Sequence, residues 1–420
     1  MVPVTLTIMS IFDEIKQSLS NRLLKNPYYL SDSYIPENPP YRKEHIIKLA
    51  RYVVECISYN LPDTILLEGL PGTGKTMCFK IVERYISSEV DNGNLPNCYV
   101  IYVNGRGLTV IEVLRDILHS LGIPVPARGF GLGYYLSILK DLLATTKMHI
   151  HICVDEIDRV GLRGTHSVED LLYVLSRYEG ISSTIITNDL QFAKKLKDPG
   201  VKSSLTEFKY ITFEKYTVDQ CYTILKDRCE LAFNEGAITD EAIHRVAEIV
   251  GVETGDIRDG LHTLRIAAYI AESKRRNVIT EDIIDIAWNE VMRKKVVDSI
   301  LTIPPMQRAI LLAMYINALL GLKEQTSYDI LDVYNKLRML LGRDKIDETS
   351  FRVKLSELER CNIISVKRVG RGDRKGVKRL YRLECPLDIL AEAFKNDPYL
   401  RDVFRKEAEE KLGNIINKDF

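Results

Sequence analysis

The sequence holds few of the residues that build metal or disulfide frameworks. Its 420 residues include one Trp, seven His and eight Cys, and no two of the cysteines form a C-x-x-C pair. This spacing argues against a zinc site of the paired-cysteine type and against a dense disulfide scaffold. We therefore expect a protein of a reducing cytosol.

Long apolar runs and a secretory leader are also missing. The longest apolar stretch, 309–322, is interrupted by Asn317 and is shorter than the roughly 20 residues that span a membrane. The N-terminal stretch MVPVTLTIMSIF lacks a basic region and leads directly to Asp13 and Glu14, unlike a secretory signal. We predict a cytoplasmic protein without a membrane partner.

Net charge is absent too, because 58 Lys and Arg are balanced by 58 Asp and Glu. The balance is uneven along the chain: residues 301–420 carry 23 basic and 18 acidic side chains, which leaves 35 and 40 for residues 1–300. A chain of this length predicts about three domains. The zero therefore hides an acidic N-terminal part and a basic C-terminal part.

Short apolar runs alternate with helix-length segments in the first half of the chain. The runs are 64–68, 98–103, 148–154 and 184–187. A Pro- and Tyr-rich lead-in, 26–45, precedes them, followed by an amphipathic helix at 46–57. Buried strands separated by helices predict a parallel sheet with helices on both faces. We expect an α/β base with its lead-in over residues 1–212.

Helical periodicity replaces the strand pattern after Phe213, and an all-α domain is expected over 213–298. Thr239 and Thr280 are expected to cap two of its helices. These four helices are predicted at 217–234, 239–250, 256–275 and 280–293.

The order helix-helix-helix-hairpin predicts a winged helix over 299–386, and a helical tail follows at 387–420. The segments of the winged helix are helices at 306–321, 326–341 and 348–360 and strands at 363–369 and 377–383.

A phosphate-binding motif follows the first apolar run. The stretch GLPGTGKT at 69–76 fits G-x-x-x-x-G-K-[ST] and opens a helix at Met77. Its glycines allow backbone N–H groups to surround phosphates at a helix N-terminus, Lys75 reaches the β/γ oxygens, and Thr76 holds Mg²⁺. This context predicts nucleotide binding.

Two further strands end in polar residues. The run at 150–154 ends in Asp155 and Glu156, which are placed to support Mg²⁺ and to polarise an attacking water. The run at 184–187 ends in Asn188, which can orient that water, although a turn-forming Asn is the alternative. A solvated acidic turn is the corresponding alternative for the carboxylates.

Arg258 falls in the first turn of a predicted helix, where the helix dipole disfavours a cation. This position indicates an anionic partner, such as a γ-phosphate reached from the helical domain. An ion pair with Glu253 or Asp256 is the alternative.

A metal site on His149, His151, Cys153 and Asp155 has to be weighed, because these residues share one strand face. A central strand buried on both faces accounts for the same pattern and is favoured. The stretch GFGLG at 129–133 resembles a dinucleotide loop only superficially, since no strand precedes it.

Positive charge is concentrated at 360–382, where nine basic residues face a single Asp373. Such density on a hairpin with a Gly-rich tip suits a phosphate backbone. In the preceding helix, Phe351, Leu355 and Leu358 form the expected buried stripe. The opposite face and the hairpin are the predicted DNA contacts, and a solvated wing on a protein-binding domain is the alternative. These contacts are Thr349, Arg352, Ser356, Arg371, Arg374, Lys375 and Lys378.

Together these features resemble the archaeal origin-recognition and cell-division-control type of replication initiators, AAA+ ATPases with a C-terminal winged helix. The resemblance runs from about Tyr34 through nearly the whole chain. Its other supporting stretches are YIPENPPYRKEH, VDEID at 154–158, DPGVKSSL at 198–205 and GDIRDGLHTLRIAA at 255–268.

The resemblance implies a role for each matching residue. Glu156, Asn188 and Arg258 are the implied catalytic residues, and Thr76 and Asp155 the implied Mg²⁺ ligands. A DNA-touching helical insertion of the family corresponds to 122–137, which contains Arg128. The implied ATP/ADP contacts are Ile35, Pro71, Gly72, Thr73, Gly74, Lys75, Thr76, Met77, Tyr222 and Arg258.

One departure from the family concerns hydrolysis. Gly200 stands where the family usually has Arg, and no Arg occurs from Val201 to Tyr216. Related motors place an arginine finger here, on a neighbouring subunit's γ-phosphate. A slow ATPase is therefore expected.

The resemblance implies a nucleoid-associated initiator that binds double-stranded origin DNA as an ATP/ADP switch for helicase recruitment. A replicative helicase and other initiator paralogues are the expected partners. Two alternatives stay open from the residues: an AAA+ DNA-remodelling motor and a nucleotide-gated transcription regulator.

Overall fold

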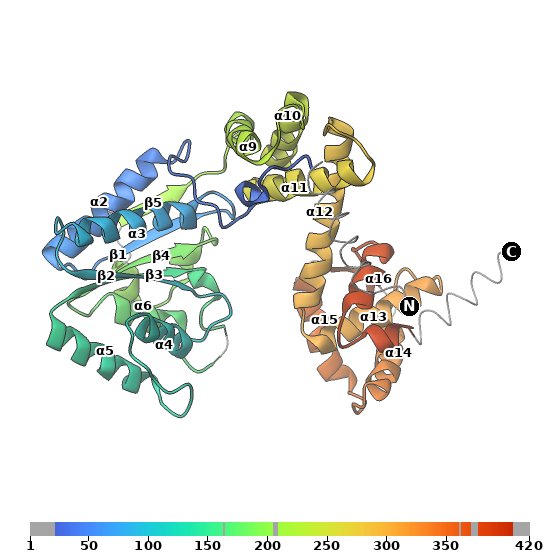
Figure 1. Ribbon diagram of the computed structural model, residues 1–420. Helices are drawn as coiled ribbons and strands as arrows, with labels where there is room; N and C mark the ends of the chain where they lie inside the picture. The colour runs from blue at the N-terminus through green and yellow to red at the C-terminus, as the bar shows by residue number, and fades with distance from the viewer. Residues whose placement is uncertain (1–21, 163, 205–208, 361–362, 371–376, 406–420) are drawn as a thin grey trace, which may run out of the picture. The chain divides into compact units, whose positions relative to one another are not determined.

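The computed structural model describes residues 22–162, 164–204, 209–360, 363–370 and 377–405. They divide into two compact units, one ending at Ala287 and the other beginning at Trp288. Figure 1 shows an α/β region and a helical region in the first unit, and helices in the second. The second unit also contains a two-stranded sheet. Among these residues, no helix combines the length and apolar character that a membrane crossing requires.

A five-stranded parallel sheet in the order β2-β3-β4-β1-β5 forms the centre of the first unit. Every residue of β1, β3 and β4 is buried, which explains their continuous apolar runs. Four strands match the sequence prediction, whereas β5 was not predicted because it is only four residues long at the sheet edge. The strands are β1 (Thr64–Gly69), β2 (Cys98–Asn104), β3 (His149–Asp155), β4 (Ile181–Thr187) and β5 (Tyr210–Phe213).

Helices cover both faces of this sheet, as predicted (Figure 1). Leu49 of α2 and Phe79 of α3 pack against one face. Val113 of α4, Tyr135 of α5 and Leu171 of α6 pack against the other. The helices of the base are α2 (Lys43–Tyr59), α3 (Lys75–Asp91), α4 (Val110–Ser120), α5 (Leu132–Thr146), η2 (Ile157–Arg159), α6 (Val168–Leu175), α7 (Phe192–Lys195) and α8 (Pro199–Ser204).

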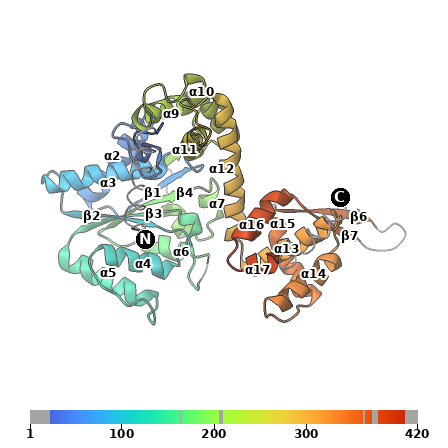
Figure 2. The ribbon, with the colours of Figure 1, turned by 45° about the vertical axis from the view of Figure 1, so that its right-hand side comes forward.

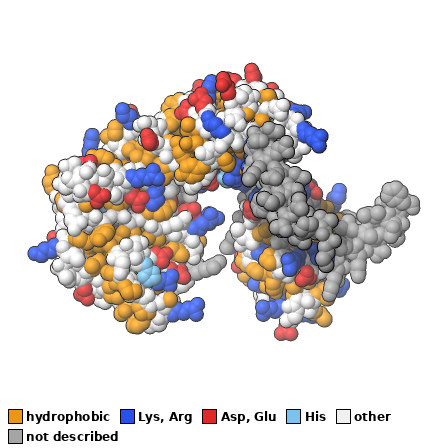
Figure 3. Space-filling model, viewed as in Figure 1, with side chains coloured by type: hydrophobic (Ala, Val, Ile, Leu, Met, Phe, Trp, Pro, Cys, Tyr) orange, Lys and Arg blue, Asp and Glu red, His pale blue; other side chains and the backbone are white. Residues whose placement is uncertain are grey.

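The helical region of the first unit that follows β5, called the lid below, has two helices that begin at Thr caps. Thr217 and Thr239 each accept a backbone N–H from the first turn of their helix. The residues just before the lead-in are attached to the lid by a β-bridge between Leu24 and Phe233. Figure 3 shows acidic side chains gathered over the α9–α10 end of the lid. The lid elements are α9 (Val218–Ala232), α10 (Asp240–Ile249), the π-helical turn η4 (Val250–Thr254), α11 (Ile257–Ser273) and the start of α12 (Glu281–Thr302). The short helix η1 (Pro27–Leu30) of the lead-in packs against α9 and α11.

The second unit is a winged helix whose core also includes the segment that follows the hairpin. Leu390, Phe394 and Phe404 belong to the same core as Phe351 and Leu355. Figure 2 shows β6 and β7 beside the helices of this unit. Its elements after α12 are α13 (Pro305–Leu319), α14 (Ser327–Leu340), α15 (Glu348–Arg360), β6 (Ile364–Gly370), β7 (Val377–Leu383), α16 (Leu387–Asn396) and α17 (Arg401–Phe404).

A buried ion pair fixes the end of this core to its first helix. Arg308 Nε and Nη2 donate to the two carboxylate oxygens of Asp397 at 2.6 and 3.0 Å. Both side chains are almost fully buried. Removing one partner would leave a buried charge uncompensated, so α13 and the segment around Asp397 depend on each other.

Candidate nucleotide and DNA sites

The GLPGTGKT loop joins the end of β1 to the start of α3. Gly74 caps α3 with φ of 92° and Gly72 has φ of 70°, so both adopt the left-handed conformation that glycine tolerates. A Cβ at Gly72 would overlap Asp256 of the lid. The loop therefore lies directly against the residue that begins α11.

Lys75 is buried, with its ammonium group inside the loop. Its Nζ donates to the carbonyl oxygens of Gly69 and Leu70, both at 2.7 Å. Burial lowers the pKa of Lys75 to about 8, although Asp155 opposes this effect. An anionic phosphate would be a stronger partner for this ammonium than neutral carbonyl groups are.

Asp155 at the end of β3 lies beside Thr76 at the start of α3. Its Oδ2 accepts from the Thr76 hydroxyl at 2.6 Å and from the Tyr102 hydroxyl at 2.9 Å. Its Oδ1 accepts from the backbone N–H of Glu156 at 2.8 Å. Burial, with Asp155 close by, raises the pKa of Tyr102, so this phenol stays a donor. The structure thus brings the two predicted Mg²⁺ ligands together.

Glu156 turns the chain sharply after β3. Its φ of 50° and ψ of 43° are in the left-handed region, which is costly for a residue with a side chain. Its carboxylate lies 3.8 Å from Nε of the exposed Arg106. The turn places Glu156 directly beyond Asp155, at the same end of the sheet as the phosphate loop.

Asn188 follows β4, which lies between β3 and β1 in the sheet. Its backbone N–H donates to Asp158 Oδ1 at 3.3 Å, and the Thr187 hydroxyl donates to the same oxygen at 2.9 Å. Asp158 therefore connects η2 to the end of β4. Asn188 is half-buried at the edge that also carries Asp155 and Gly69.

Arg258 makes the ion pair that the sequence left open as an alternative. Its Nε and Nη2 donate to Oδ1 and Oδ2 of Asp256 at 2.9 and 2.7 Å. Because Asp256 adjoins Gly72, the pair lies next to the phosphate loop. Arg258 is also near enough to Lys75 to oppose protonation of its ammonium. Its role toward phosphate stays a prediction.

The other two predicted nucleotide contacts lie in the lead-in and in the lid. Ile35 is half-buried in the lead-in. Tyr222 on α9 donates to Asp240 at 2.7 Å and packs on the ring of His244, with ring centroids 4.7 Å apart. Tyr222 thus contacts α10, and its role toward the nucleotide, like that of Ile35, stays a prediction.

Sequence reasoning missed Arg42 and Tyr216, which hold the phosphate loop from outside. Arg42 is buried, and its Nε and Nη2 donate to the carbonyl oxygens of Thr73 and Glu214 at 2.9 and 2.8 Å. Its guanidinium lies 4.0 Å from the ring centroid of Tyr216. Arg42 is a cation at the N-cap of α2, so the dipole argument applied to Arg258 could have identified it.

Gly200 lies in α8, beside Arg177 from the turn that follows α6. A Cβ at this position would lie 3.2 Å from Nη2 of Arg177 and 3.1 Å from Oδ1 of Asp198. The backbone N–H of Gly200 donates to Asp198 at 2.7 Å.

The histidines of β3 are hydrogen-bonded to hydroxyl groups of β4. Ser182 Oγ lies 2.7 Å from both His149 Nε2 and His151 Nδ1. Thr184 Oγ1 lies 2.9 Å from His151 Nε2. Burial lowers the pKa of His149 to about 4 and of His151 to about 3. These contacts explain both residues as parts of a buried strand, the interpretation favoured from the sequence.

The predicted DNA-contacting helix, α15, has the expected two faces. Phe351, Leu355 and Leu358 are fully buried, whereas Thr349 and Arg352 are exposed and Ser356 is partly exposed. Arg371, Arg374 and Lys375 lie outside the described residues. Lys378 is in β7, opposite Val369 in the antiparallel register.

Arg128 is exposed in the loop between α4 and α5. The Tyr135 hydroxyl donates to the carbonyl oxygen of Pro126 at 2.8 Å, and Arg115 Nη1 donates to that of Ala127 at 3.4 Å. These contacts hold the loop onto the two helices. A DNA role for Arg128 stays a prediction.

A phosphate loop beside a strand-end aspartate, a helical lid and a winged helix define an AAA+ ATPase with a winged-helix domain. Family models agree: an AAA domain matches residues 61–190, a Cdc6 AAA+ ATPase-type lid domain 222–289, and a CDC6 C-terminal winged-helix domain 298–393.

Curated relatives narrow the class to a family. ORC1-type DNA replication protein 1 of Sulfolobus acidocaldarius is 32% identical over 97% of this chain and 99% of its own length. The protein of the same name in Sulfurisphaera tokodaii is 33% identical over 86% of this chain and 91% of its own length. The solved Aeropyrum pernix ORC1 protein in complex with DNA has a TM-score of 0.78 and 29% identity, covering 90% of this chain and 98% of its own. The chain belongs to the ORC1/Cdc6 family of replication initiators.

Proposed function

We propose that this chain binds ATP and ADP between base and lid, and double-stranded origin DNA through its winged helix. The observation that carries the nucleotide part is the convergence of Lys75, Thr76 and Asp155 at one end of the parallel sheet. Ligands of open α/β sheets bind beyond the carboxyl ends of the strands. The loop glycines and the N-terminus of α3 suit phosphate oxygens there.

We propose that Thr76 and Asp155 hold Mg²⁺ together with the nucleotide. Their hydroxyl and carboxylate are the hard oxygen donors that this cation prefers, and they already lie within one hydrogen bond of each other. Bound Mg²⁺ would neutralise charge on the phosphates. Glu156 would accept a hydrogen bond from the attacking water, Asn188 would orient that water, and Arg258 would exchange Asp256 for a phosphate oxygen.

The DNA part of the proposal is supported by the exposed polar face of α15 and by the basic composition of the hairpin. Arg128 in the α4–α5 loop is a second proposed contact. The nucleotide state would then act as a switch for recruiting a replicative helicase or initiator paralogues at the chromosome.

We propose four regions along the chain. The base with its lead-in is 1–212, the lid is 213–298, the winged helix is 299–386 and the helical tail is 387–420.

Nucleotide retention tests the first step of this function. Lys75→Ala should abolish retention of labelled ATP on a filter, because the buried ammonium is the cation within the loop. Lys140→Ala is the matched control, since Lys140 is an exposed lysine on α5 of the same unit. Normal retention by Lys75→Ala would refute the assignment of the phosphate loop.

A further inference from the structure

One exposed side chain of α15 differs in kind from its neighbours. Phe351, Leu355 and Leu358 define the buried stripe of this helix. At 3.6 residues per turn, Val353 projects almost directly opposite that stripe. Its side chain is 57% exposed, and it is the one large apolar residue exposed among the described residues of α15.

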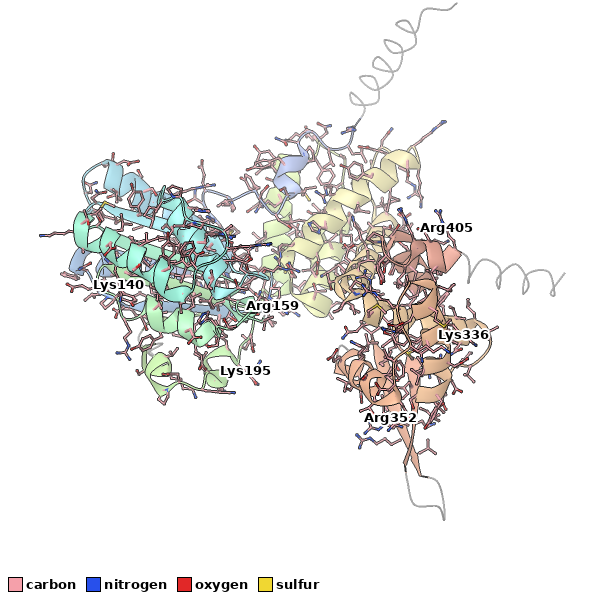
Figure 4. All side chains as sticks on the ribbon, turned by 90° about the horizontal axis from the view of Figure 1, so that it is seen from below. Lys140, Arg159, Lys195, Lys336, Arg352 and Arg405 are labelled. Carbon is pink, nitrogen blue, oxygen red and sulfur yellow. The ribbon has the colours of Figure 1, made fainter. Side chains whose placement is uncertain are left out.

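The polar neighbours of Val353 are engaged by protein partners, including Glu357 one turn later, which accepts a hydrogen bond from Gln307 of α13. Arg352 forms an ion pair with Glu348 one turn earlier. The Ser356 hydroxyl donates to the backbone carbonyl oxygen of Val353 at 2.7 Å. Figure 4 shows Arg352 projecting outward from this unit. The two methyl groups of Val353 are therefore the apolar centre of a face whose polar groups are partly satisfied.

The residue type is also unfavourable for a merely solvated helix position. A β-branched side chain loses rotamer freedom in a helix, and Lys, Glu or Gln would be better formers there. Exposed apolar surface gains free energy only when a partner covers it. In the major groove of DNA, the 5-methyl group of thymine is the apolar feature that distinguishes one base edge from the others.

We infer that Val353 is a specificity-determining residue, whose methyl groups contact the 5-methyl group of one thymine in the bound duplex. This inference rests on the proposed DNA-binding function and refines it. It assigns base discrimination to an apolar contact at the middle of α15, while the basic hairpin supplies contacts to phosphates that carry no sequence information.

Deoxyuridine substitution measures this contact directly, because it removes only the methyl group. The full chain would first select a tight-binding duplex from a random pool, and each thymine of that duplex would then be replaced in turn. At one position the wild type should lose about three- to fivefold in affinity, the effect of one buried methyl group. Val353→Ala should bind the thymine and deoxyuridine duplexes equally there.

Two controls keep the result interpretable. Val353→Ala should fold, because Ala is the stronger helix former and the side chain is not in the core. Val296→Ala, on α12 and also exposed, should keep the wild-type loss at the same thymine.

Failure of this inference can be distinguished from failure of the proposed DNA-binding function. Equal losses in wild type and Val353→Ala at every thymine, with duplex binding retained, would overturn this inference alone. Absence of any duplex binding by the full chain would refute the proposed DNA function, and the inference with it.

Discussion

At Lys75, burial and a neighbouring carboxylate act in opposite directions on one ammonium group. Burial is the larger effect and brings its pKa to about 8, with Arg258 adding to the decrease. The carbonyl oxygens of Gly69 and Leu70 satisfy its hydrogen bonds without adding a counter-charge. A bound phosphate would supply that charge, so nucleotide binding should be coupled to protonation of this lysine.

This coupling predicts a pH dependence of nucleotide affinity. Below pH 8 the ammonium is charged before binding, whereas above pH 8 binding must also take up a proton. The Kd for ATP should therefore rise as pH increases from 8 to 10, by up to about tenfold per unit. Calorimetry in buffers of different ionisation enthalpy would measure the proton uptake. Lys75→Arg stays charged, so any binding it retains should not change over this range; a parallel rise would contradict the explanation.

At the scale of elements, β3 and β4 are joined by a chain of polar side chains inside the sheet. Asn60 Oδ1, an acceptor, lies 2.9 Å from His149 Nδ1. His149 therefore donates from Nδ1, and its Nε2 accepts from Ser182. Ser182 in turn accepts from His151 Nδ1, and Thr184 donates to His151 Nε2. Both imidazoles are neutral near pH 7, because burial lowers their pKa values.

The hydrogen-bonded chain of His149 and His151 predicts that the protein loses stability in acid. His149 and His151 have folded-state pKa values of about 4 and about 3, below the unfolded value of roughly 6.5. The unfolded state therefore binds more protons below pH 6.5, and the free energy of unfolding falls as pH decreases toward 3. Denaturant titrations at pH 7 and pH 5 should differ by about 4 kcal/mol from this pair.

A variant isolates this contribution from that of the carboxylates. His151→Asn should be less stable at pH 7 but should lose about 2 kcal/mol less than the wild type between pH 7 and pH 5. His119→Asn, at an exposed position on α4, is the matched control and should keep the wild-type slope. If the free energy of unfolding of His151→Asn fell between pH 7 and pH 5 as much as that of the wild type, the histidine chain would be ruled out as the cause of the acid sensitivity.

The hairpin is the second element with a measurable electrostatic effect. Each cation removed from a phosphate should reduce the slope of log K against log salt by about 0.9. Arg371→Ala combined with Arg374→Ala should therefore weaken duplex binding and reduce the slope by about two. Lys336→Ala, an exposed cation on α14 that pairs with Asp332, should leave the slope unchanged. Unchanged affinity and slope in the double variant would exclude a DNA role for the hairpin tip.

At the scale of the whole molecule, the lead-in connects the lid to the phosphate loop within the first unit. Asp32 pairs with His262 of α11, and the Tyr41 hydroxyl donates to Thr223 of α9. Arg42, the next residue, then donates to the Thr73 carbonyl oxygen. The lead-in is therefore held both to the lid and to the phosphate loop.

Turnover should depend little on contact between molecules. Gly200 supplies no arginine finger, and an arginine finger contributes several orders of magnitude in rate. ATP hydrolysis should be slow, and its rate per chain should stay constant as protein concentration rises. Gly200→Arg is the informative comparison, because it restores the residue type. Strong concentration-dependent activation of the wild type would show that another cation acts in trans.

The sequence alone determined the four longer strands of the sheet and the phosphate-loop motif, because these depend on local patterns. Continuous apolar runs fixed β1, β3 and β4, and the motif at 69–76 with its flanking strand and helix identified the phosphate loop. Bounds were less accurate: α12 continues to Thr302, whereas its predicted helix ends at 293. The apolar repeat of a helix weakens where its residues stop packing on one core and begin to pack on another, so the end of such a helix is hard to predict from sequence.

Only the tertiary structure decided which residues meet. Residue spacing could not show that Arg42 holds Thr73 and Tyr216, or that Asp256 lies against Gly72 and pairs with Arg258. It also could not separate Val353 from the other exposed positions of α15. Such contacts join segments distant in sequence, and they depend on burial and side-chain direction, which are properties of the packed chain.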